Sequence, residues 1–317
     1  MSSIEFRSPF EVVCHTHSKL GPLLAEQQEK VREDNSHDAC LTIGELVDYG
    51  TRFFGQEVLF TDTDHPAHVL DRLGIQRQEL GNGSLEIGIK RISEGVAQRA
   101  SLIKDHFPGQ VLTGVEVDIL NREGTLDVSD ATLASLDVVI ASFHYNIWKL
   151  VNPGQKPTAL DYVDSIVEAA QNPHVDIIGH PCGDLQRSYL ATMKPEDWDY
   201  LLEIMAANKV AFEVNLSKYW RGGEKIEFEK QLIRRAAEKG LFFVLSLDFH
   251  SLAPYAAYKD PNKVENIFVS SDYDTNLQMF LRFRTILKQL RELGLNELNI
   301  LNIDKLQFLN WLGARNS

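Results

Sequence analysis

Short apolar runs recur along the chain, and each is nearly continuous in hydrophobicity rather than alternating with polar residues. Continuous runs of this length, rich in Val, Ile, Leu and Phe, are typical of parallel strands that are covered on both faces. The pattern therefore predicts seven buried strands, at residues 10–17, 57–65, 110–120, 136–144, 174–181, 210–215 and 241–250.

Longer segments with helical periodicity lie between these strands and after the last of them. They predict helices at 84–107, 159–172, 194–209, 228–240, 277–294 and 303–313. Alternation of strands and helices favours either a barrel or a doubly wound sheet, both in the α/β class. Because no Pro/Gly/Ser-rich linker interrupts the pattern, we expect a single domain over residues 1–317, with C-terminal helices within 275–317 packed on it.

Composition narrows the classes of partner. The 317 residues are 44% hydrophobic, enough for a large core, and 32 Lys and Arg against 45 Asp and Glu give a net charge of −13. A chain this acidic is a poor partner for nucleic-acid polymers. No run approaches the roughly 20 apolar residues of a membrane span. Three cysteines, Cys14, Cys40 and Cys182, do not form a disulfide framework, and the N-terminal segment lacks the pattern of a signal peptide, so we expect a cytoplasmic protein.

Histidines gather at the predicted strand ends. Seven of the ten lie at or just beyond the C-terminal end of a strand or in the loop that follows: His15, His17, His37, His65, His144, His180 and His250. Two acids accompany them, Glu116 within "GVEVDIL" and Asp248 within "LDFH". Since residues i and i+2 of a strand point to the same face, His15 with His17, and Asp248 with His250, can each present two groups to one point.

This arrangement indicates a metal site. A lone buried histidine is more often a hydrogen-bonded core residue than a ligand. Several imidazoles packed together without metal, however, would repel one another when protonated, and their desolvation would not be offset. Imidazole and carboxylate are ligands that suit zinc, manganese or iron. We therefore expect these side chains to hold divalent ions where the strand ends meet.

The same segments resemble a known family, the PHP (polymerase and histidinol phosphatase) family, and particularly its stand-alone phosphoesterases. The matching segments occur in the family's order between about residues 10 and 251: "CHTHS", "SHD", "TDH", "GVEVDILNREGTLD", "LDVVIASFH", "NPHVDIIGHP", "FEVN" and "SLDFHS". The resemblance implies a distorted TIM-like (β/α)7 barrel with its metal site at the C-terminal ends of the strands.

The resemblance also implies three divalent ions, as Zn, Mn or Fe. His15, His17, Glu116 and Asp248 would hold the first, Glu116, His144 and His180 the second, and His37, His65 and His250 the third. Two positions depart from the family's pattern. Cys14 stands where an acidic residue usually precedes the first H-x-H, and Asp248-Phe249-His250 replaces the usual Asp-Ala-His. The loss of an acceptor at Cys14 would alter how a histidine is oriented.

The activity implied is hydrolysis of a small phosphomonoester, in the manner of histidinol phosphatases, by attack of metal-activated hydroxide. Glu116, Asp248 and His250 would serve the chemistry directly. Phosphate would be contacted by basic residues in the loops after two strands, Arg187, Lys218 and Arg221. The partner expected is thus a small phosphorylated substrate, with no nucleic-acid polymer and no membrane, and the sequence does not determine the oligomeric state.

Other roles stay open. A nucleotide or a small phosphodiester is the alternative substrate within the same chemistry, and an amidohydrolase acting on C–N bonds is a second alternative. A scaffold that has lost its metals is a third, against which the complete ligand set argues. Among neighbouring residues, Asp64 either orients a ligand or caps a helix, and Cys182 is a packed thiol. Tyr145 and Trp148 either shape the substrate pocket or anchor their loop.

Overall fold

A computed structural model describes residues 11–18, 43, 44, 47, 59–65, 85–185, 187–216, 224–249 and 285–315 of the chain. Within these ranges the backbone alone is described for Arg187, Glu224, Lys225, Leu247 and Phe249. Two of the expected metal ligands, His37 and His250, and two of the expected phosphate contacts, Lys218 and Arg221, lie outside the described residues.

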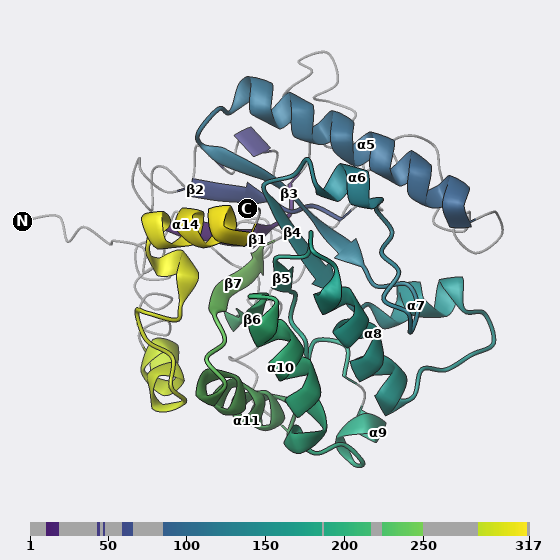
Figure 1. Ribbon diagram of the computed structural model, residues 1–317, viewed down its shortest axis with the longest axis vertical. Helices are drawn as coiled ribbons and strands as arrows, with labels where there is room; N and C mark the ends of the chain where they lie inside the picture. The colour runs from purple at the N-terminus through teal and green to yellow at the C-terminus, as the bar shows by residue number, and fades with distance from the viewer. Residues whose placement is uncertain are drawn as a thin grey trace, which may run out of the picture.

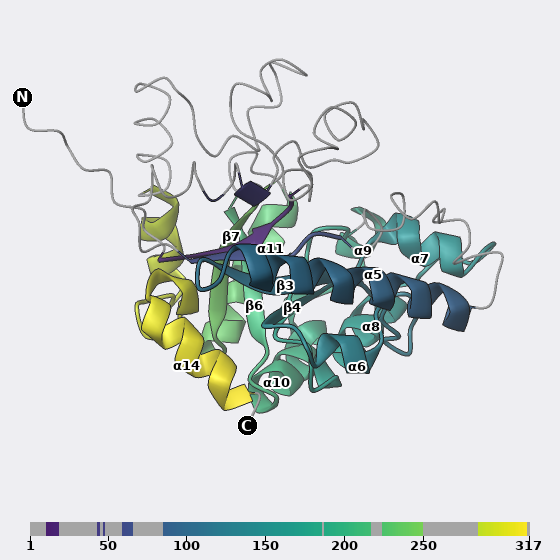
Figure 2. The same cartoon turned by 90° about the horizontal axis from the view of Figure 1, so that it is seen from above.

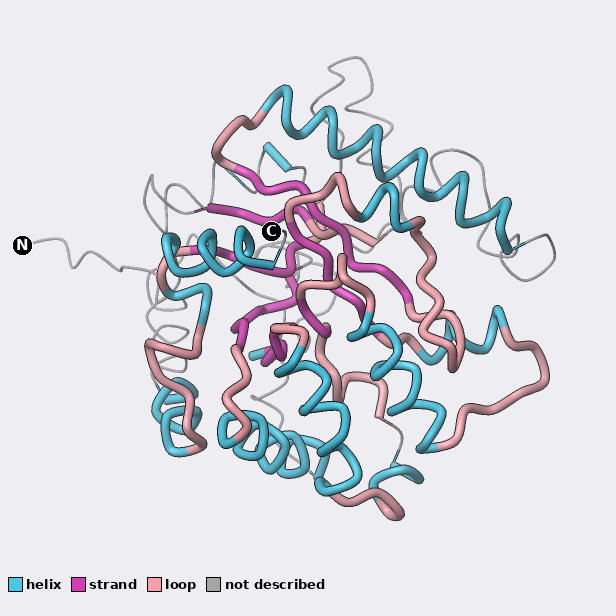
Figure 3. The backbone as a smooth tube through the Cα atoms, viewed as in Figure 1, coloured by secondary structure: helices cyan, strands magenta, loops and turns pink. Residues whose placement is uncertain are grey.

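Seven parallel strands form a closed barrel at the centre of the molecule (Figure 1, Figure 3). Each strand pairs with its neighbour in sequence, and β1 pairs with β7 to close the ring. The strands are β1 Val12–Thr16, β2 Leu59–Asp62, β3 Val111–Asp118, β4 Val138–Ser142, β5 Ile177–Ile178, β6 Ala211–Asn215 and β7 Phe243–Phe249. All seven predicted strands are confirmed, and the barrel, rather than a doubly wound sheet, is the architecture.

Helices surround the barrel in the order that strand–helix alternation predicts (Figure 1). They are α5 Leu85–His106, α6 Asp130–Leu133, α7 Tyr145–Val151, α8 Ala159–Gln171, α9 Arg187–Leu190, α10 Asp199–Ala207, α11 Glu224–Glu238 and α14 Lys305–Arg315, with 3-10 helices η3 Pro195–Trp198 and η6 Leu301–Ile303. Residues 285–292 are also helical. Among the described residues, no helix is long and apolar enough to cross a membrane.

Two helix boundaries differ from the prediction. The segment predicted as one helix over 194–209 begins instead as η3, in which Pro195 occupies the first turn and the Asp197 carboxylate accepts the backbone N–H of Lys194 at 2.6 Å. Helix α11 starts at Glu224, four residues before the predicted start. The short helices α6, α7 and α9 were not predicted, because four to seven residues do not display a helical period.

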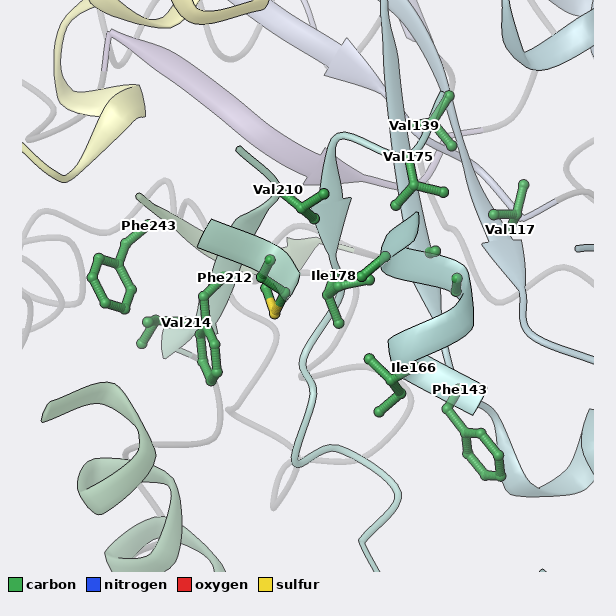
Figure 4. Packing of buried hydrophobic residues seen from close by; sticks show 14 of the residues in the cluster. Val117, Val139, Phe143, Ile166, Val175, Ile178, Val210, Phe212, Val214 and Phe243 are labelled. Carbon is green, nitrogen blue, oxygen red and sulfur yellow. The ribbon is translucent and has the colours of Figure 1, made fainter. Parts of the chain in front are cut away.

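Alternation along the strands separates two hydrophobic layers. Val139, Ile178 and Phe212 belong to the large outer cluster that packs beneath the helices, and Figure 4 shows labelled residues of this layer from β3 to β7 and α8. The residues next to them in sequence, such as Ile140 and Ile177, belong to a second cluster that fills the N-terminal end of the barrel interior. Each strand thus has an inward and an outward face, and this parity places the polar residues of the site.

Helix α14 packs over the N-terminal end of the barrel. Its Phe308, Trp311 and Leu312 join the inner cluster. The two views place α14 and α7 on opposite sides of the molecule (Figure 1, Figure 2). Just before α14, the buried Asn302 side chain donates to the carbonyl oxygens of Val12 at 3.0 Å and Leu245 at 2.8 Å, and accepts the Leu245 N–H at 3.0 Å. These bonds join the seam between β1 and β7 to the C-terminal segment.

Candidate metal centre

The described residues of the candidate site lie at the C-terminal ends of the strands, the end opposite α14. They come from β1 and the residues after it, from the segments that follow β2, β4 and β5, and from β3 and β7: His15, His17, His65, Glu116, His144, His180 and Asp248. Four of them are buried, and His65, His144 and Asp248 are half-buried. Parallel strands carry their C-terminal ends to one rim of a barrel, and the loops there build most sites of this architecture.

Glu116 stands at the centre of the imidazoles. Its Oε2 lies 3.0 Å from the Nε2 atoms of both His15 and His65 and 3.5 Å from that of His17. Its Oε1 lies 2.9 Å from His180 Nε2 and 3.6 Å from His144 Nε2. Each carboxylate oxygen therefore faces a different set of imidazoles, which is the arrangement of a carboxylate that bridges two ions.

Asp248 completes a second group with the two histidines of β1. Its Oδ1 lies 3.2 Å from His17 Nε2 and 3.6 Å from His15 Nε2, and its Oδ2 accepts from the Asn215 amide at 3.0 Å. The ligand atoms of His15, His17 and Asp248 all lie within 4.8 Å of one another, as do those of His15, Glu116 and His180, and those of His17, His65 and Glu116. The three residues of each group are therefore close enough to bind the same ion.

The grouping of His65 differs from the one that the family resemblance implies. That resemblance places His65 in a third group with His37 and His250. In the structure its ring stacks on that of His17, with 4.6 Å between centroids, and its Nε2 faces Glu116. His65 therefore lies against the residues expected to hold the first ion, whereas the other two members of its implied group lie outside the described residues.

A kink in the backbone turns His15 toward this group. Val12 and Cys14 face the barrel interior and Val13 faces the helices, so simple alternation would direct His15 outward. Instead His15 has a φ of +59° and Asp248, across the seam, has a φ of +50°, while the β1–β7 register shifts between Cys14 and Thr16. Non-glycine residues in this region are strained, and such strain is commonly held where a side chain must be aimed at a site. His180, with a φ of +25°, is a third example in the same site.

A second ring of carboxylates lies behind the imidazoles. Glu213 on β6 contacts His15 Nδ1 and also accepts the backbone N–H of His180. Asp118 contacts His144 Nδ1 at 2.5 Å, and Asp64 lies 3.5 Å from His17 Nδ1. A carboxylate on one ring nitrogen fixes the tautomer, leaving the other nitrogen free to act as a ligand. Asp64 faces His17 Nδ1 at ion-pair distance, and its role in orienting a ligand, rather than capping a helix, stays a prediction.

Glu213 and Asp118 were not predicted as site residues. The signal for both was present in the alternation of the strands. Asp118 lies two residues after Glu116 on β3, and Glu213 lies two residues after the inward-facing Ala211 on β6. Glu213 supplies His15 with the carboxylate that Cys14 does not provide. This contact reaches His15 from a strand distant in sequence, and a changed histidine orientation at Cys14 stays a prediction.

Buried acids and imidazoles together dominate the electrostatics of the site. Burial alone would lower the pKa of His15, but Glu116, Glu213 and Asp248 outweigh burial and raise it well above its usual value. Burial would likewise raise the pKa of Glu116, yet His15 and His65 hold it well below its usual range. For His65, burial prevails and lowers the pKa to about 3. For His144, Asp118 overcomes burial and raises the pKa to about 9. Metal binding must therefore displace protons from some of these imidazoles.

The buried nitrogen and oxygen atoms of the site are of the kinds that bind divalent ions. His15 Nε2, Glu116 Oε2 and His180 Nδ1 are buried and accept or donate no hydrogen bond within the described part of the chain. Two of these atoms, His15 Nε2 and Glu116 Oε2, lie only 3.0 Å apart. Buried polar atoms without hydrogen bonds are costly, and coordination to a cation would satisfy them. The site can therefore hold metal ions through nitrogen and carboxylate ligands.

Four further residues that the sequence singled out lie near the site. Cys182 is buried in the outer hydrophobic cluster, as expected of a packed thiol. Trp148 is buried in the same cluster and Tyr145 packs against it, so both anchor α7. Tyr145 also donates its backbone N–H to Asp184 at 2.7 Å. The backbone of Arg187 begins α9, just after the loop that carries His180.

Replacing Glu213 with glutamine is expected to weaken zinc binding by about 10- to 100-fold, the usual effect of losing a carboxylate behind a histidine ligand. Glutamine has the shape of glutamate but no charge and only one acceptor oxygen. It therefore cannot replace the carboxylate that contacts His15 Nδ1 and accepts the His180 backbone N–H. Competition against a chromophoric chelator measures the change. Glu227→Gln, at an exposed glutamate on α11 that pairs with Lys230 at 2.8 Å, is the control. Equal affinity in the two variants would contradict the role given to Glu213.

Comparison with known proteins finds probable phosphatases and a DNA polymerase among the relatives of this chain. The DNA polymerase/3'-5' exonuclease PolX of Bacillus subtilis (strain 168) is 32% identical over 145 residues, 45% of this chain and 22% of that protein. A probable phosphatase of Thermoanaerobacter sp. (strain X514) is 30% identical over 171 residues, 53% of this chain and 64% of that protein. A probable phosphatase of Clostridium acetobutylicum is 27% identical over 186 residues, 58% of this chain and 69% of that protein.

The similarity is partial in length. The chain spans 22% of PolX and 64% of the Thermoanaerobacter phosphatase. No protein-family model matches the chain. A chain in a cryo-EM structure of archaeal ribonuclease P with mature tRNA is similar over 62% of this chain and 74% of that chain, with 14% identity and a TM-score of 0.30, a likeness too low to support a conclusion.

Proposed function

The chain belongs to the PHP family, and on that premise we propose that it is a metal-dependent hydrolase of small phosphate esters. The observation that carries the proposal is the position of Glu116, whose two oxygens face the Nε2 atoms of five histidines from four segments of the chain. A carboxylate shared in this way suits a site with more than one ion. The probable phosphatases among the relatives support phosphate esters as the substrate class.

We propose that the site takes three divalent ions, as zinc, manganese or iron. His15, His17, Glu116, His144, His180 and Asp248 would hold two of them, and His65, with His37 and His250, would complete the site. When bound, divalent ions supply Lewis acidity: they lower the pKa of water towards 7 and neutralise charge on phosphoryl oxygens. Carboxylate and imidazole ligands leave the choice among these metals open.

The protein's own residues prepare the site for an anionic substrate. Glu116 and Asp248 bring negative charge to the rim, and Glu213, Asp118 and Asp64 add more behind the histidines. A phosphate dianion would be repelled by this set unless cations were present, so substrate binding depends on metal loading. Asp118 and Glu213 hold the rings of His144 and His15 so that their Nε2 atoms face the centre of the site.

For the substrate, we propose a small phosphomonoester, as in histidinol phosphatases, in a cytoplasmic protein. A nucleotide or small phosphodiester is the alternative within the same chemistry. Arg187, Lys218 and Arg221 are proposed to contact phosphate from the loops that follow β5 and β6. The test is a substrate panel of phosphomonoesters, phosphodiesters and amides, each assayed with zinc, manganese and iron. The class of substrate that is hydrolysed distinguishes a phosphomonoesterase, a phosphodiesterase and an amidohydrolase. We propose, too, that residues 1–317 form one domain.

Removal of metal is expected to abolish phosphatase activity, and addition of metal is expected to restore it. Dialysis against a chelator should reduce release of phosphate from p-nitrophenyl phosphate to the level of buffer, and addition of Zn²⁺, Mn²⁺ or Fe²⁺ should restore it. Inductively coupled plasma mass spectrometry should find about three ions per chain in the active protein. Activity that survives complete removal of metal, or a protein that takes up no ion of the three, would contradict the proposal.

A further inference from the structure

A buried arginine lies behind the candidate site and has no part in the chemistry proposed so far. Arg99 is on the inward face of α5, the long helix that packs outside β3, and its side chain is 6% exposed. Burying a guanidinium is costly unless its donors are satisfied, and an apolar side chain of similar length would pack there at lower cost. Its presence therefore calls for a reason beyond packing.

All three nitrogens of the guanidinium reach the ends of β1 and β2. Nε donates to Asp62 Oδ2 at 2.6 Å, and Nη2 donates to Asp62 Oδ1 at 2.7 Å, a two-point contact. Nη1 donates to Asp64 Oδ2 at 3.0 Å. Nη2 also donates to the Ser18 carbonyl oxygen at 2.9 Å and to its hydroxyl at 3.0 Å. Arg99 thus joins the residue after His17 to the residue before His65.

The network continues into the metal site through Asp64. One oxygen of this carboxylate accepts from Arg99, and the other lies 3.5 Å from His17 Nδ1. The Ser18 hydroxyl in turn donates to Asp62 Oδ1 at 2.8 Å. Asp62, Asp64 and Ser18 are all buried, so these contacts are shielded from water. The rings that they flank, His17 and His65, stack with 4.6 Å between centroids.

We propose that Arg99 is a positioning residue of the metal centre, which fixes His17 and His65 side by side through Asp64, Asp62 and Ser18. One guanidinium holds two carboxylates that would otherwise repel each other where β1 and β2 end. It also holds Asp64 in the orientation that faces His17 Nδ1. The inference rests on the proposed function, because it concerns residues proposed to bind metal.

The test compares metal binding in three variants. Arg99→Met removes the charge and all donors, Arg99→Lys keeps the charge but cannot make the two-point contact, and Asp64→Asn leaves the contact between Arg99 and Asp62 intact. Competition with a chromophoric chelator measures the zinc dissociation constant, and the visible absorption of the cobalt-substituted protein reports the coordination of the ion. We expect zinc binding about 10- to 100-fold weaker in Arg99→Met and Asp64→Asn, with a changed cobalt spectrum, and a smaller loss in Arg99→Lys.

Two controls separate positioning from general stability. Arg235→Met removes a partly buried two-point contact remote from the site, in which Nε and Nη2 donate to Asp199 at 2.9 and 2.6 Å, and should leave zinc affinity unchanged. Asn302→Ala weakens the opposite end of the barrel and should lower stability without changing zinc affinity at a temperature where it is folded.

Three outcomes are decisive. Unchanged zinc affinity and cobalt spectrum in both Arg99→Met and Asp64→Asn would overturn the role of Arg99. So would an equal loss of affinity in Asn302→Ala, which would assign the effect to stability. If Arg99→Met does not fold, Arg99→Lys decides, because it keeps the charge but not the two-point contact with Asp62: unchanged zinc affinity and cobalt spectrum in that variant would overturn the role of Arg99. A wild-type protein that binds no zinc, manganese or iron would instead contradict the proposed function.

Discussion

Glu116→Gln is expected to lower kcat/KM for a phosphomonoester by about 10³-fold or more, because it removes the charge that two groups of histidines share. Loss of one electrostatic group from an active site commonly costs about 10²–10³ in rate, and here the same change also weakens metal binding. The glutamine amide nitrogen would face the Nε2 atoms of His15 and His65 or that of His180, where it cannot serve as a ligand. Steady-state kinetics and metal content of the purified variant measure both effects.

The control for this variant is Glu203→Gln, at an exposed glutamate of α10 that pairs with Lys239 at 2.8 Å. It should retain wild-type kinetics and metal content. Circular dichroism of both metal-free proteins establishes that each is folded. A Glu116→Gln enzyme within tenfold of the wild type, with its full complement of ions, would contradict the bridging role of this carboxylate.

The largest effect on stability is expected for Asn302→Ala, with a free energy of unfolding lower by about 3–5 kcal/mol. The substitution leaves two carbonyl oxygens and one N–H of β1 and β7 without their partners in a buried setting, and each costs about 1–3 kcal/mol. Chemical denaturation of the metal-free protein measures the change, since bound metal would add its own stabilisation.

Asn299→Ala provides the matched comparison three residues earlier. Asn299 is half-buried, and its side chain makes two exposed hydrogen bonds: it accepts the Asn296 backbone N–H at 2.7 Å and donates to the Gly294 carbonyl oxygen at 3.0 Å. Water can replace these partners, so the expected loss is below about 1 kcal/mol. If the two variants unfold at the same denaturant concentration, the Asn302 contacts do not secure the seam of the barrel.

The inward and outward alternation of the strands explains which parts of the site could be predicted. Glu116 lies on the inward face of β3, as its place between the outward-facing Val115 and Val117 indicates. For His15 the alternation fails, because the left-handed backbone at this residue and the register shift beside it reverse the direction of its side chain. Such a kink depends on pairing between the first and last strands, which no local pattern reports.

By itself, the amino-acid sequence determined seven buried strands, their order relative to the helices, and the histidines, Glu116 and Asp248 at the strand ends. These follow from local periodicity and from residue chemistry, which a chain carries before it folds. Periodicity left a barrel and a doubly wound sheet open, the family resemblance implied the barrel, and the tertiary structure confirmed it. Only the tertiary structure decided that His65 stacks on His17, and that Glu213 and Arg99 contact the site from distant segments. Those relations are contacts between residues up to 233 positions apart, as in the pairing of Thr16 with Phe249 that closes the barrel, so no local pattern carries them.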